Sequence, residues 1–312
     1  MAKISVITAV LNEEATVRRC YEEVKRVFSA MGGEHTYEHI FGDNRSTDQT
    51  LTILREIAAA DPNVKVLVYS RNFGAEKSAF TLLQHASGDA CIGIAADLQE
   101  PPDLFPKMLD LWSQGNELVL GLYQNSSDSW AMRRIKNTYY RLASWLSDEE
   151  LEKDFSNYAL LDRRVIDEML KVDDFAPYIR GLISTVGFKK AYFTYKRNPR
   201  TGGQSKHRFG FLLDFGLNAV ISYSILPIRL ATILGLSLSS LSILLAFTYA
   251  MLKIFKWNFQ APGATTTIVL ILFFSGIQLF FLGLLGEYIG AIHGQVRRKP
   301  FVIVREKINF QD

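Results

Sequence analysis

Cysteine and histidine are scarce in this chain of 312 residues, which contains two cysteines and five histidines. Neither Cys20 nor Cys91 has the spacing of a metal site, and the histidines are scattered without a ligand pattern. The sequence therefore offers no disulfide framework and no zinc site. We expect both cysteines to be reduced residues of the core, as suits a cytosolic catalytic part.

The common glycine-rich phosphate loops are missing as well. The sequence contains no Walker A loop, and no G-x-G-x-x-G follows a strand, so a nucleotide would have to be bound by another arrangement. The net charge is only +3, which gives no overall field that favours nucleic acid. No signal peptide precedes the first strand, so we expect the N-terminal domain to stay in the cytosol.

The first two-thirds of the chain alternates apolar, β-branched runs with segments of helical periodicity. We expect strands at residues 4–10, 37–42, 64–70, 90–96 and 117–123, then at 157–161, and an edge strand at 188–197. We expect helices at residues 13–30, 48–60, 76–86, 102–114, 130–146 and 163–171. This alternation predicts an α/β fold with βαβ units and a mostly parallel sheet. Ligands bind such sheets beyond the carboxyl ends of the strands.

Two long apolar runs, at residues 230–252 and 266–285, are confined to the last third. Each reaches the ~20 residues of a membrane-spanning helix, although a pair of buried core helices is the alternative. The apolar, aromatic segment before them predicts an amphipathic helix at the membrane interface. The sequence therefore predicts a catalytic domain at residues 1–208, an interfacial helix at 209–228, two transmembrane helices in a hairpin at 229–290 and a tail at 291–312.

Basic residues lie at the two ends of this hairpin. Arg229 precedes the first run and Arg297 and Arg298 follow the second, whereas the turn between them carries Lys253 and Lys256. The positive-inside rule then puts both termini and the catalytic domain in the cytoplasm. We expect a multi-pass protein of the plasma membrane or the bacterial inner membrane.

An acidic loop follows the expected strand at residues 90–96. A carboxylate at the end of a central strand is well placed to hold a divalent cation, because Mg²⁺ commonly uses one or two carboxylates together with substrate phosphates. Asp97 would supply the carboxylate and Gln99 a carbonyl oxygen, so Mg²⁺ or Mn²⁺ is the expected cofactor. Alternatively, Asp97 caps the helix that starts near Pro102, and the sequence leaves both interpretations open.

A second strand-to-helix loop carries Asp43, whose carboxylate could accept hydrogen bonds from a base or a ribose. Ser46 or Thr47 is expected to cap the next helix, which explains these two hydroxyls but not Asp43. Neighbouring loops bring further polar residues to the same edge of the sheet: Asn12, Glu13 and Arg71.

Basic residues lie in two segments that could contact phosphate. Arg200, Ser205 and Lys206 precede the interfacial helix, where arginine suits bidentate phosphate contact and lysine acts as a point charge. A solvated basic loop near anionic lipid is the alternative. Arg133 and Arg134 form a second possible phosphate contact, which a plain surface helix explains nearly as well.

Five segments resemble one enzyme family. Residues 6–14, V-I-T-A-V-L-N-E-E, resemble the opening strand of the inverting GT-A glycosyltransferases of family 2, and residues 43–48 resemble their nucleotide-binding loop. Residues 71–74, R-N-F-G, and 97–102, D-L-Q-E-P-P, resemble the polyisoprenyl-phosphate branch, as do residues 202–206 before the two apolar runs. That branch includes bactoprenol glucosyl transferases and dolichol-phosphate mannose synthases. The resemblance covers nearly the whole chain and implies a GT-A, Rossmann-like fold.

The resemblance also implies roles for the candidate residues. Asp43 would contact the uracil or guanine base, and Asp97 and Gln99 would contact the metal and the diphosphate. The lipid phosphate would be held by Arg200, Ser205 and Lys206, and the catalytic residues would be Asp97, Arg200 and Lys206.

Two residues depart from the family's pattern. Ala95 stands at the first position of the usual Asp-x-Asp motif, which could weaken the metal site, and Asn157 stands where an acid is often found. Asn157 cannot act as a general base, and Asp154 is a weak substitute. The chemistry does not require a base, because a phosphate monoester with a second pKa near roughly 6 is largely dianionic at neutral pH.

The leading interpretation is a membrane-anchored, metal-dependent hexosyltransferase that moves glucose from UDP-glucose to polyprenyl phosphate with inversion. Its partners would be the nucleotide sugar, the lipid acceptor and the bilayer, and not nucleic acid. One alternative is a processive polysaccharide synthase, which usually has an Arg-Trp motif and more spans than two. Another is a non-catalytic binding protein, which Ala95 and Asn157 motivate. Small residues such as Gly276 and Gly283 favour a homo-oligomer, for example a tetramer.

Overall fold

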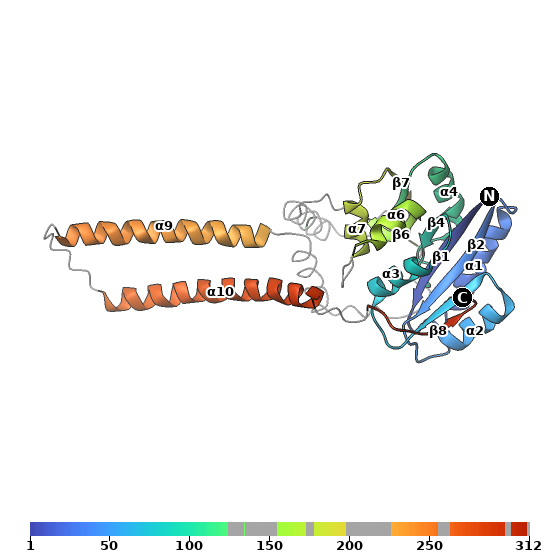
Figure 1. Cartoon of the computed structure of the whole chain (residues 1–312), viewed down its shortest axis with the longest axis horizontal. Coiled ribbons are helices and arrows are strands. Elements are labelled where there is room, and N and C mark those ends of the chain that lie inside the picture. Colours follow the sequence, from blue (N-terminus) through green and yellow to red (C-terminus); the bar gives the residue numbers. More distant parts are fainter. Residues whose placement is uncertain are drawn as a thin grey trace. The chain divides into compact units, whose positions relative to one another are not determined.

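The computed structural model describes residues 1–123, 134, 155–172, 178–197, 226–254, 263–296 and 301–310. The described chain divides into two compact units (Figure 1). The sheet unit contains the N-terminal two-thirds and the C-terminal strand, and the helical unit contains α9 (Leu226–Ile254) and α10 (Ala264–Val296).

The sheet unit contains an eight-stranded sheet with the order β7-β5-β6-β4-β1-β2-β3-β8 in the described chain. Its strands are β1 (Ala2–Val10), β2 (His35–Asp43), β3 (Val64–Tyr69), β4 (Ala90–Gly93), β5 (Leu118–Tyr123), β6 (Phe155–Asp162), β7 (Lys190–Tyr195) and β8 (Val304–Ile308). The pairs β1–β2, β1–β4, β2–β3 and β5–β7 are parallel, whereas β6 and β8 run antiparallel to their neighbours. The predicted α/β fold with a mostly parallel sheet is confirmed.

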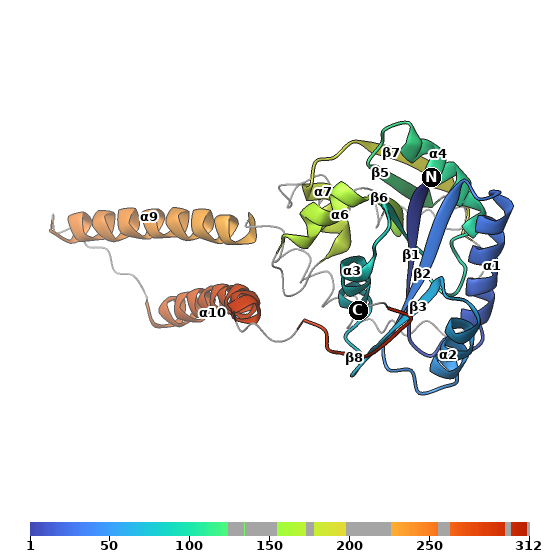
Figure 2. The same ribbon diagram turned by 45° about the vertical axis from the view of Figure 1, so that its right-hand side comes forward.

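Helices cover both faces of this sheet (Figure 2). They are α1 (Val17–Ala30), α2 (Thr50–Ala60), α3 (Ala75–His85), α4 (Phe105–Ser113), α6 (Arg163–Leu170) and α7 (Ile179–Thr185), with a 3₁₀ turn η1 (Pro102–Leu104) before α4. Strand side chains alternate between two cores, so that Val66 and Val68 pack with α1 and α2 while Leu67 packs with α3. Cys20 and Cys91 are free and buried in these cores, as predicted.

Most sequence-predicted elements are present with ends displaced by a few residues. The first helix begins at Val17 and not at residue 13, because the N–H groups of Thr16 and Val17 both bond to the Glu13 carbonyl in a turn. Strand β4 ends at Gly93, so the acidic loop starts three residues earlier than expected. The predicted helix at residues 130–146 lies outside the described residues except for Arg134.

The C-terminal segment returns to the sheet, where the sequence predicted no strand. Strand β8 pairs antiparallel with β3 and forms the edge opposite β7. The Asn309 side-chain amide donates to the carbonyls of Ala58 at 2.6 Å and Val64 at 2.9 Å, which joins the chain after β8 to the last turn of α2 and the first residue of β3. The end of the chain therefore stabilises the same unit that carries the candidate site.

Glu38 on β2 is a buried carboxylate that the core holds in its charged form. It accepts hydrogen bonds from the Ser5 hydroxyl at 2.6 Å and the Lys65 ammonium at 2.7 Å. Burial acts to raise the pKa of Glu38, but the hydrogen bonds from Lys65 and Ser5 outweigh it and lower the pKa to about 2. The charged Glu38 carboxylate therefore makes its full contribution to the free energy of unfolding above the ordinary carboxyl pKa of ~4.3. This contribution is lost as the pH falls toward 2.

Replacing Glu38 by glutamine should destabilise the sheet unit at neutral pH by roughly 3 kcal/mol, because Lys65 loses its buried partner. The difference in free energy of unfolding between the wild type and E38Q should shrink between pH 4.5 and pH 2. Urea denaturation of both proteins at pH 7 and pH 3 measures this difference in free energy of unfolding. A difference that is independent of pH would contradict this account.

The helical unit is strongly apolar on its surface. Large side chains of α9 and α10 are exposed, including Phe247, Leu279 and Phe280. Within the described part of the chain, Phe273–Gly290 in α10 is the stretch long and apolar enough to cross a membrane, and it is 6% buried. A shorter apolar stretch, Ala231–Leu245, lies in α9. The expected number of two spans stays a prediction.

Candidate functional site

Four loops meet at the carboxyl ends of β1 to β4, and hydrogen bonds join the first two. The Asn12 N–H donates to the Ser46 hydroxyl at 3.0 Å, and the Thr47 N–H donates to the Asn12 side-chain oxygen at 2.7 Å. The Glu13 N–H donates to the Thr50 hydroxyl at 2.8 Å. The loop after β1 and the loop after β2 therefore form one bonded structure, as parallel strands with adjacent ends allow.

The backbone of this edge has left-handed conformations at residues other than glycine. Asn12 has φ 56°, Arg45 has φ 60° and Leu98 has φ 54°, and each lies in a different loop. Such conformations are costly for residues with a Cβ and cluster at binding sites, where the surrounding structure maintains them. Contacts with the surrounding structure therefore have to maintain the backbone conformation of these three loops.

Asp43 ends β2 as a fully buried carboxylate. Its two oxygens accept the Ser46 N–H at 3.2 and 3.3 Å. Burial raises the pKa of Asp43, and the hydrogen bonds from Ser46 offset only part of that rise. The site thus holds a desolvated carboxylate, which gains more from a further hydrogen-bond donor than an exposed one would.

The expected cap of α2 by Ser46 or Thr47 is wrong. Helix α2 begins at Thr50, whose N–H donates to the Asp48 carboxylate at 3.0 Å. The Ser46 hydroxyl is used instead by the loop after β1, where it accepts the Asn12 N–H. Joining the loops, and not capping, accounts for this serine.

The loop after β3 is tied to the loop after β2. The Arg45 guanidinium donates to the Ser70 carbonyl at 3.1 Å, and the Phe73 N–H donates to the Asn44 side-chain oxygen at 3.2 Å. Arg71 is exposed and lies over the Phe73 ring at 4.2 Å. Arg71 is thus at the predicted edge, with its guanidinium packed against its own loop.

The acidic loop after β4 contains a tight turn. The Asp97 carboxylate accepts the Gln99 N–H at 3.2 Å around Leu98, and the Tyr158 hydroxyl donates to the Pro101 carbonyl at 2.7 Å. Asp97 does not cap the 3₁₀ turn that begins at Pro102, since that turn has no side-chain cap. The alternative role considered for Asp97 is therefore wrong, and its carboxylate orders the acidic loop itself.

The donor set at this loop suits a cation that is shared with a ligand. Among the described residues, no group of three or more histidine, cysteine, aspartate or glutamate side chains could hold a metal ion. Asp97 and Gln99 are both half-buried on the same turn and supply oxygen donors. Oxygen donors from one carboxylate, one amide and substrate phosphates fit Mg²⁺ or Mn²⁺.

Several predicted residues cannot be placed at this edge. Arg133, Arg200, Ser205 and Lys206 lie outside the described residues, and Arg134 is described only as an exposed helical residue. Their proposed contacts with phosphate therefore stay predictions.

Sequence reasoning assigned no role to Glu100, which the structure buries at 7% exposure. The Arg197 guanidinium lies 3.5 Å from its Oε1 and stacks over the Tyr123 ring at 4.8 Å. Burial raises the pKa of Glu100, while the charge of Arg197 lowers it. The available signal was an acid before two prolines, but the contact with a residue 97 positions later is invisible in a single sequence.

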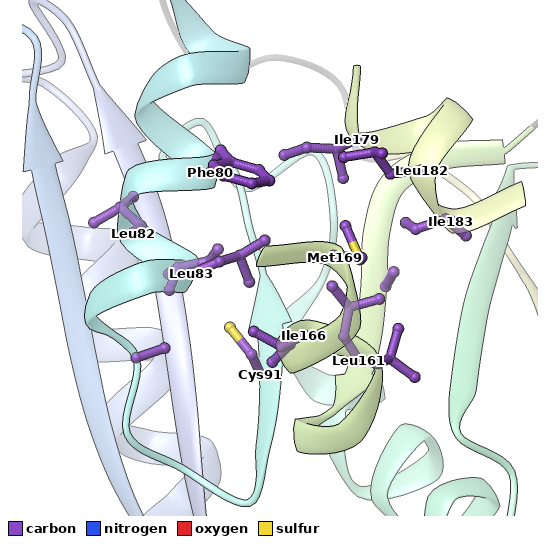
Figure 3. Close-up of a cluster of buried hydrophobic side chains, with 14 of the residues drawn as sticks. Phe80, Leu82, Leu83, Cys91, Leu161, Ile166, Met169, Ile179, Leu182 and Ile183 are labelled. Atoms are coloured by element: carbon purple, nitrogen blue, oxygen red, sulfur yellow. The ribbon is translucent and has the colours of Figure 1, made fainter. Parts of the chain in front are cut away.

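A pocket of about 210 Å³ lies beside Glu100. It runs along the face of the sheet covered by α3 and α7 and is lined by apolar residues of β1, β4, β6 and these helices. Figure 3 shows the hydrophobic cluster that forms part of its wall, with Leu83, Leu161 and Ile183 among the labelled side chains. The exposed Ala95, in the loop after β4, also lines it.

Comparison with known proteins identifies the enzyme class. Residues 5–187 match the family model described as glycosyl transferase family 2. The chain belongs to glycosyl transferase family 2. Its mostly parallel α/β sheet is the GT-A, Rossmann-like fold of that family, and the protein is a glycosyltransferase. Residues 227–292 match a second model, described as the GtrB C-terminal hairpin.

Several relatives of this family 2 enzyme match over nearly its whole length. An uncharacterized glycosyltransferase, YkcC of Bacillus subtilis (strain 168), is 33% identical and covers 99% of this chain and 95% of its own. The bactoprenol glucosyl transferase of Shigella phage SfII is 32% identical and covers 97% of this chain and 98% of its own. A solved structure, mannosyltransferase PcManGT from Pyrobaculum calidifontis in complex with GDP-Man and Mn²⁺, is 14% identical with a TM-score of 0.49, over 96% of this chain and 88% of that one.

Proposed function

We propose that this family 2 glycosyltransferase transfers glucose from UDP-glucose to polyprenyl phosphate at the cytoplasmic face of a membrane, with inversion. The observation that carries the proposal is the coupling of two features in one chain. One is the set of loops at the carboxyl ends of β1 to β4, which carries Asp43 and Asp97, and the other is an apolar C-terminal hairpin. Such a chain suits one substrate in water and another in lipid. The relative named bactoprenol glucosyl transferase supports a lipid acceptor of this class.

In the proposed reaction, an oxygen of the lipid phosphate forms a bond to the anomeric carbon from the face opposite the diphosphate. The bond between that carbon and the diphosphate oxygen breaks, and its electron pair leaves with UDP. The acceptor is largely dianionic at neutral pH, with a second pKa near roughly 6, so no proton has to be removed. The protein's task is to position the two substrates and to stabilise the charge of the leaving group.

The residues of the site divide this task. Asp43 would bind the base from its buried position, and the Asn12 loop would form the adjoining wall. Asp97 and Gln99 would hold a divalent metal, which supplies positive charge to the diphosphate when bound. Arg200 and Lys206 are proposed to hold the acceptor phosphate.

The same proposal covers the membrane. The hairpin at residues 229–290 would cross the membrane twice, with both termini and the sheet unit in the cytoplasm, and small residues of α10 would pack against a neighbouring subunit. The exposed apolar side chains of α9 and α10 support this, because water does not favour such a surface.

The test is transfer of labelled sugar to undecaprenyl phosphate by the purified full chain in detergent. UDP-glucose, UDP-galactose, UDP-N-acetylglucosamine and GDP-mannose are each supplied with Mg²⁺, with Mn²⁺ and with a chelator. We expect one lipid-soluble product that carries a single sugar, formed from UDP-glucose and lost with the chelator. A polymer would indicate a processive synthase. Binding of UDP-glucose without a product from any donor would indicate a non-catalytic binding protein.

A further inference from the structure

Glu100 carries a buried oxygen that the protein leaves without a hydrogen-bond partner. Its Oε2 is buried and has no hydrogen-bond partner within the described structure, while its Oε1 lies 3.5 Å from Arg197. A buried carboxylate oxygen without a donor is costly, and native proteins rarely keep one unless it serves a purpose. The unsatisfied acceptor therefore indicates a ligand that supplies a donor.

The pocket that Glu100 lines is mostly apolar. Most of its walls come from small and aliphatic side chains, among them Ala9, Ala79 and Ile179. Tyr158 also lines it, and its hydroxyl donates to the Pro101 carbonyl, so Glu100 is the one carboxylate among the described lining residues. A ligand hydroxyl that enters the pocket has few other groups to bond with. The carboxylate would therefore determine which hydroxyl, and in which orientation, is accepted.

The position of the pocket limits what the ligand can be. Glu100 follows Asp97 by three residues in the acidic loop, and Ala95 lines the pocket two residues before Asp97. The hydrogen bonds at Gln99 and Pro101 fix the loop on both sides of Glu100. A sugar joined to a diphosphate at Asp97 would lie within reach of this pocket, because the two groups are covalently linked.

We infer that this pocket receives the hexose of the nucleotide sugar and that Glu100 selects it by accepting a hydrogen bond from one ring hydroxyl on Oε2. The inference rests on the proposed function, since it takes a nucleotide sugar as the donor. The apolar walls face the carbon–hydrogen faces of the ring. An isoprene chain would also fit such walls, but it would leave Oε2 unsatisfied.

The predicted consequence is discrimination between sugars by one hydrogen bond. A bond to a charged acceptor contributes roughly 10- to 100-fold to affinity, and an epimer with that hydroxyl turned away loses this factor. UDP alone has no hydroxyl in the pocket, so Glu100 should not influence its binding. Comparing UDP-glucose with UDP therefore isolates the contribution of the pocket.

The experiment measures the dissociation constants of UDP-glucose and UDP by calorimetry in Mn²⁺ for the full-length wild type and for E100Q. We expect UDP-glucose to bind at least about 10-fold more weakly to E100Q, with the UDP constant unchanged. The matched control is D103N, three residues further along the chain, where Asp103 pairs with Arg26 on the surface. D103N should bind both ligands like the wild type.

A series of UDP-glucose analogues, each lacking one ring hydroxyl, locates the bond. One analogue should bind the wild type weakly and should lose no further affinity in E100Q, because the variant and the analogue remove the same interaction. Equal losses in both proteins for every analogue would overturn the inference, as would a parallel loss of UDP affinity. Weaker binding of polyprenyl phosphate alone would assign the pocket to the lipid.

The two proposals fail in different ways. Normal UDP-glucose binding without transfer to the lipid counts against the proposed function and leaves the role of Glu100 standing. Transfer with a UDP-glucose affinity that E100Q does not change counts against Glu100 alone. No binding of UDP-glucose overturns both.

Discussion

Asp97→Asn should lower the rate of glycosyl transfer by about 10²- to 10³-fold while the fold remains intact. The Asp97 carboxylate accepts the Gln99 N–H, and asparagine keeps an oxygen at that position, so the turn around Leu98 survives. What the variant loses is the negative charge that would hold a divalent cation against the diphosphate. Steady-state transfer with UDP-glucose and undecaprenyl phosphate, at saturating Mn²⁺, measures the effect.

The control for this variant is Asp89→Asn, at the opposite end of β4. Asp89 is exposed and accepts the Lys3 N–H at 2.7 Å, far along the strand from the acidic loop. D89N should transfer glucose like the wild type, and both variants should give the wild-type circular dichroism spectrum. A folded D97N enzyme with full activity would remove Asp97 from the site and leave the metal without its carboxylate.

The order of strands and helices along the chain could be predicted because most strands are continuous apolar runs. Residues 4–10 and 64–69 are buried between two layers of helices, so their composition alone reveals them. Strand β8 was missed because Val304–Ile308 reads V-R-E-K-I, with charged residues that suit a half-exposed edge. Its place in the sheet depends on pairing with β3, more than two hundred residues earlier, which no local pattern contains.

The candidate site could be predicted in part for the same reason. Asp43 and Asp97 follow strands directly, and the carboxyl ends of parallel strands share an edge. The left-handed backbone at Asn12 and Arg45 could not be predicted, since neither residue requires it and only the contacts between loops maintain it. Glu100 was missed because its burial and its nearness to Arg197 depend on packing across the whole sheet unit.

Asp43→Ala should weaken UDP binding by about 10- to 100-fold, because it removes a charged acceptor from the proposed base site. It should also lower the free energy of unfolding by roughly 1–3 kcal/mol, since the Ser46 N–H loses its partner in the buried turn. Asp43→Asn keeps one acceptor oxygen, so it should lose less UDP affinity and less free energy of unfolding than Asp43→Ala. Calorimetry with UDP and urea denaturation measure the two effects.

The pH dependence of UDP binding tests the same carboxylate. Burial raises the pKa of Asp43 above the ordinary value, so its charged form is lost at a higher pH than for an exposed aspartate. UDP affinity should therefore fall as the pH decreases through that raised pKa, and D43N should lack this fall. The matched control is E38Q, which removes another buried carboxylate from the same strand. Glu38 lies five residues before Asp43, and its loss costs stability without touching the site, so E38Q should bind UDP like the wild type. Equal UDP affinities for D43A and E38Q would mean that Asp43 only stabilises its turn and does not contact the base.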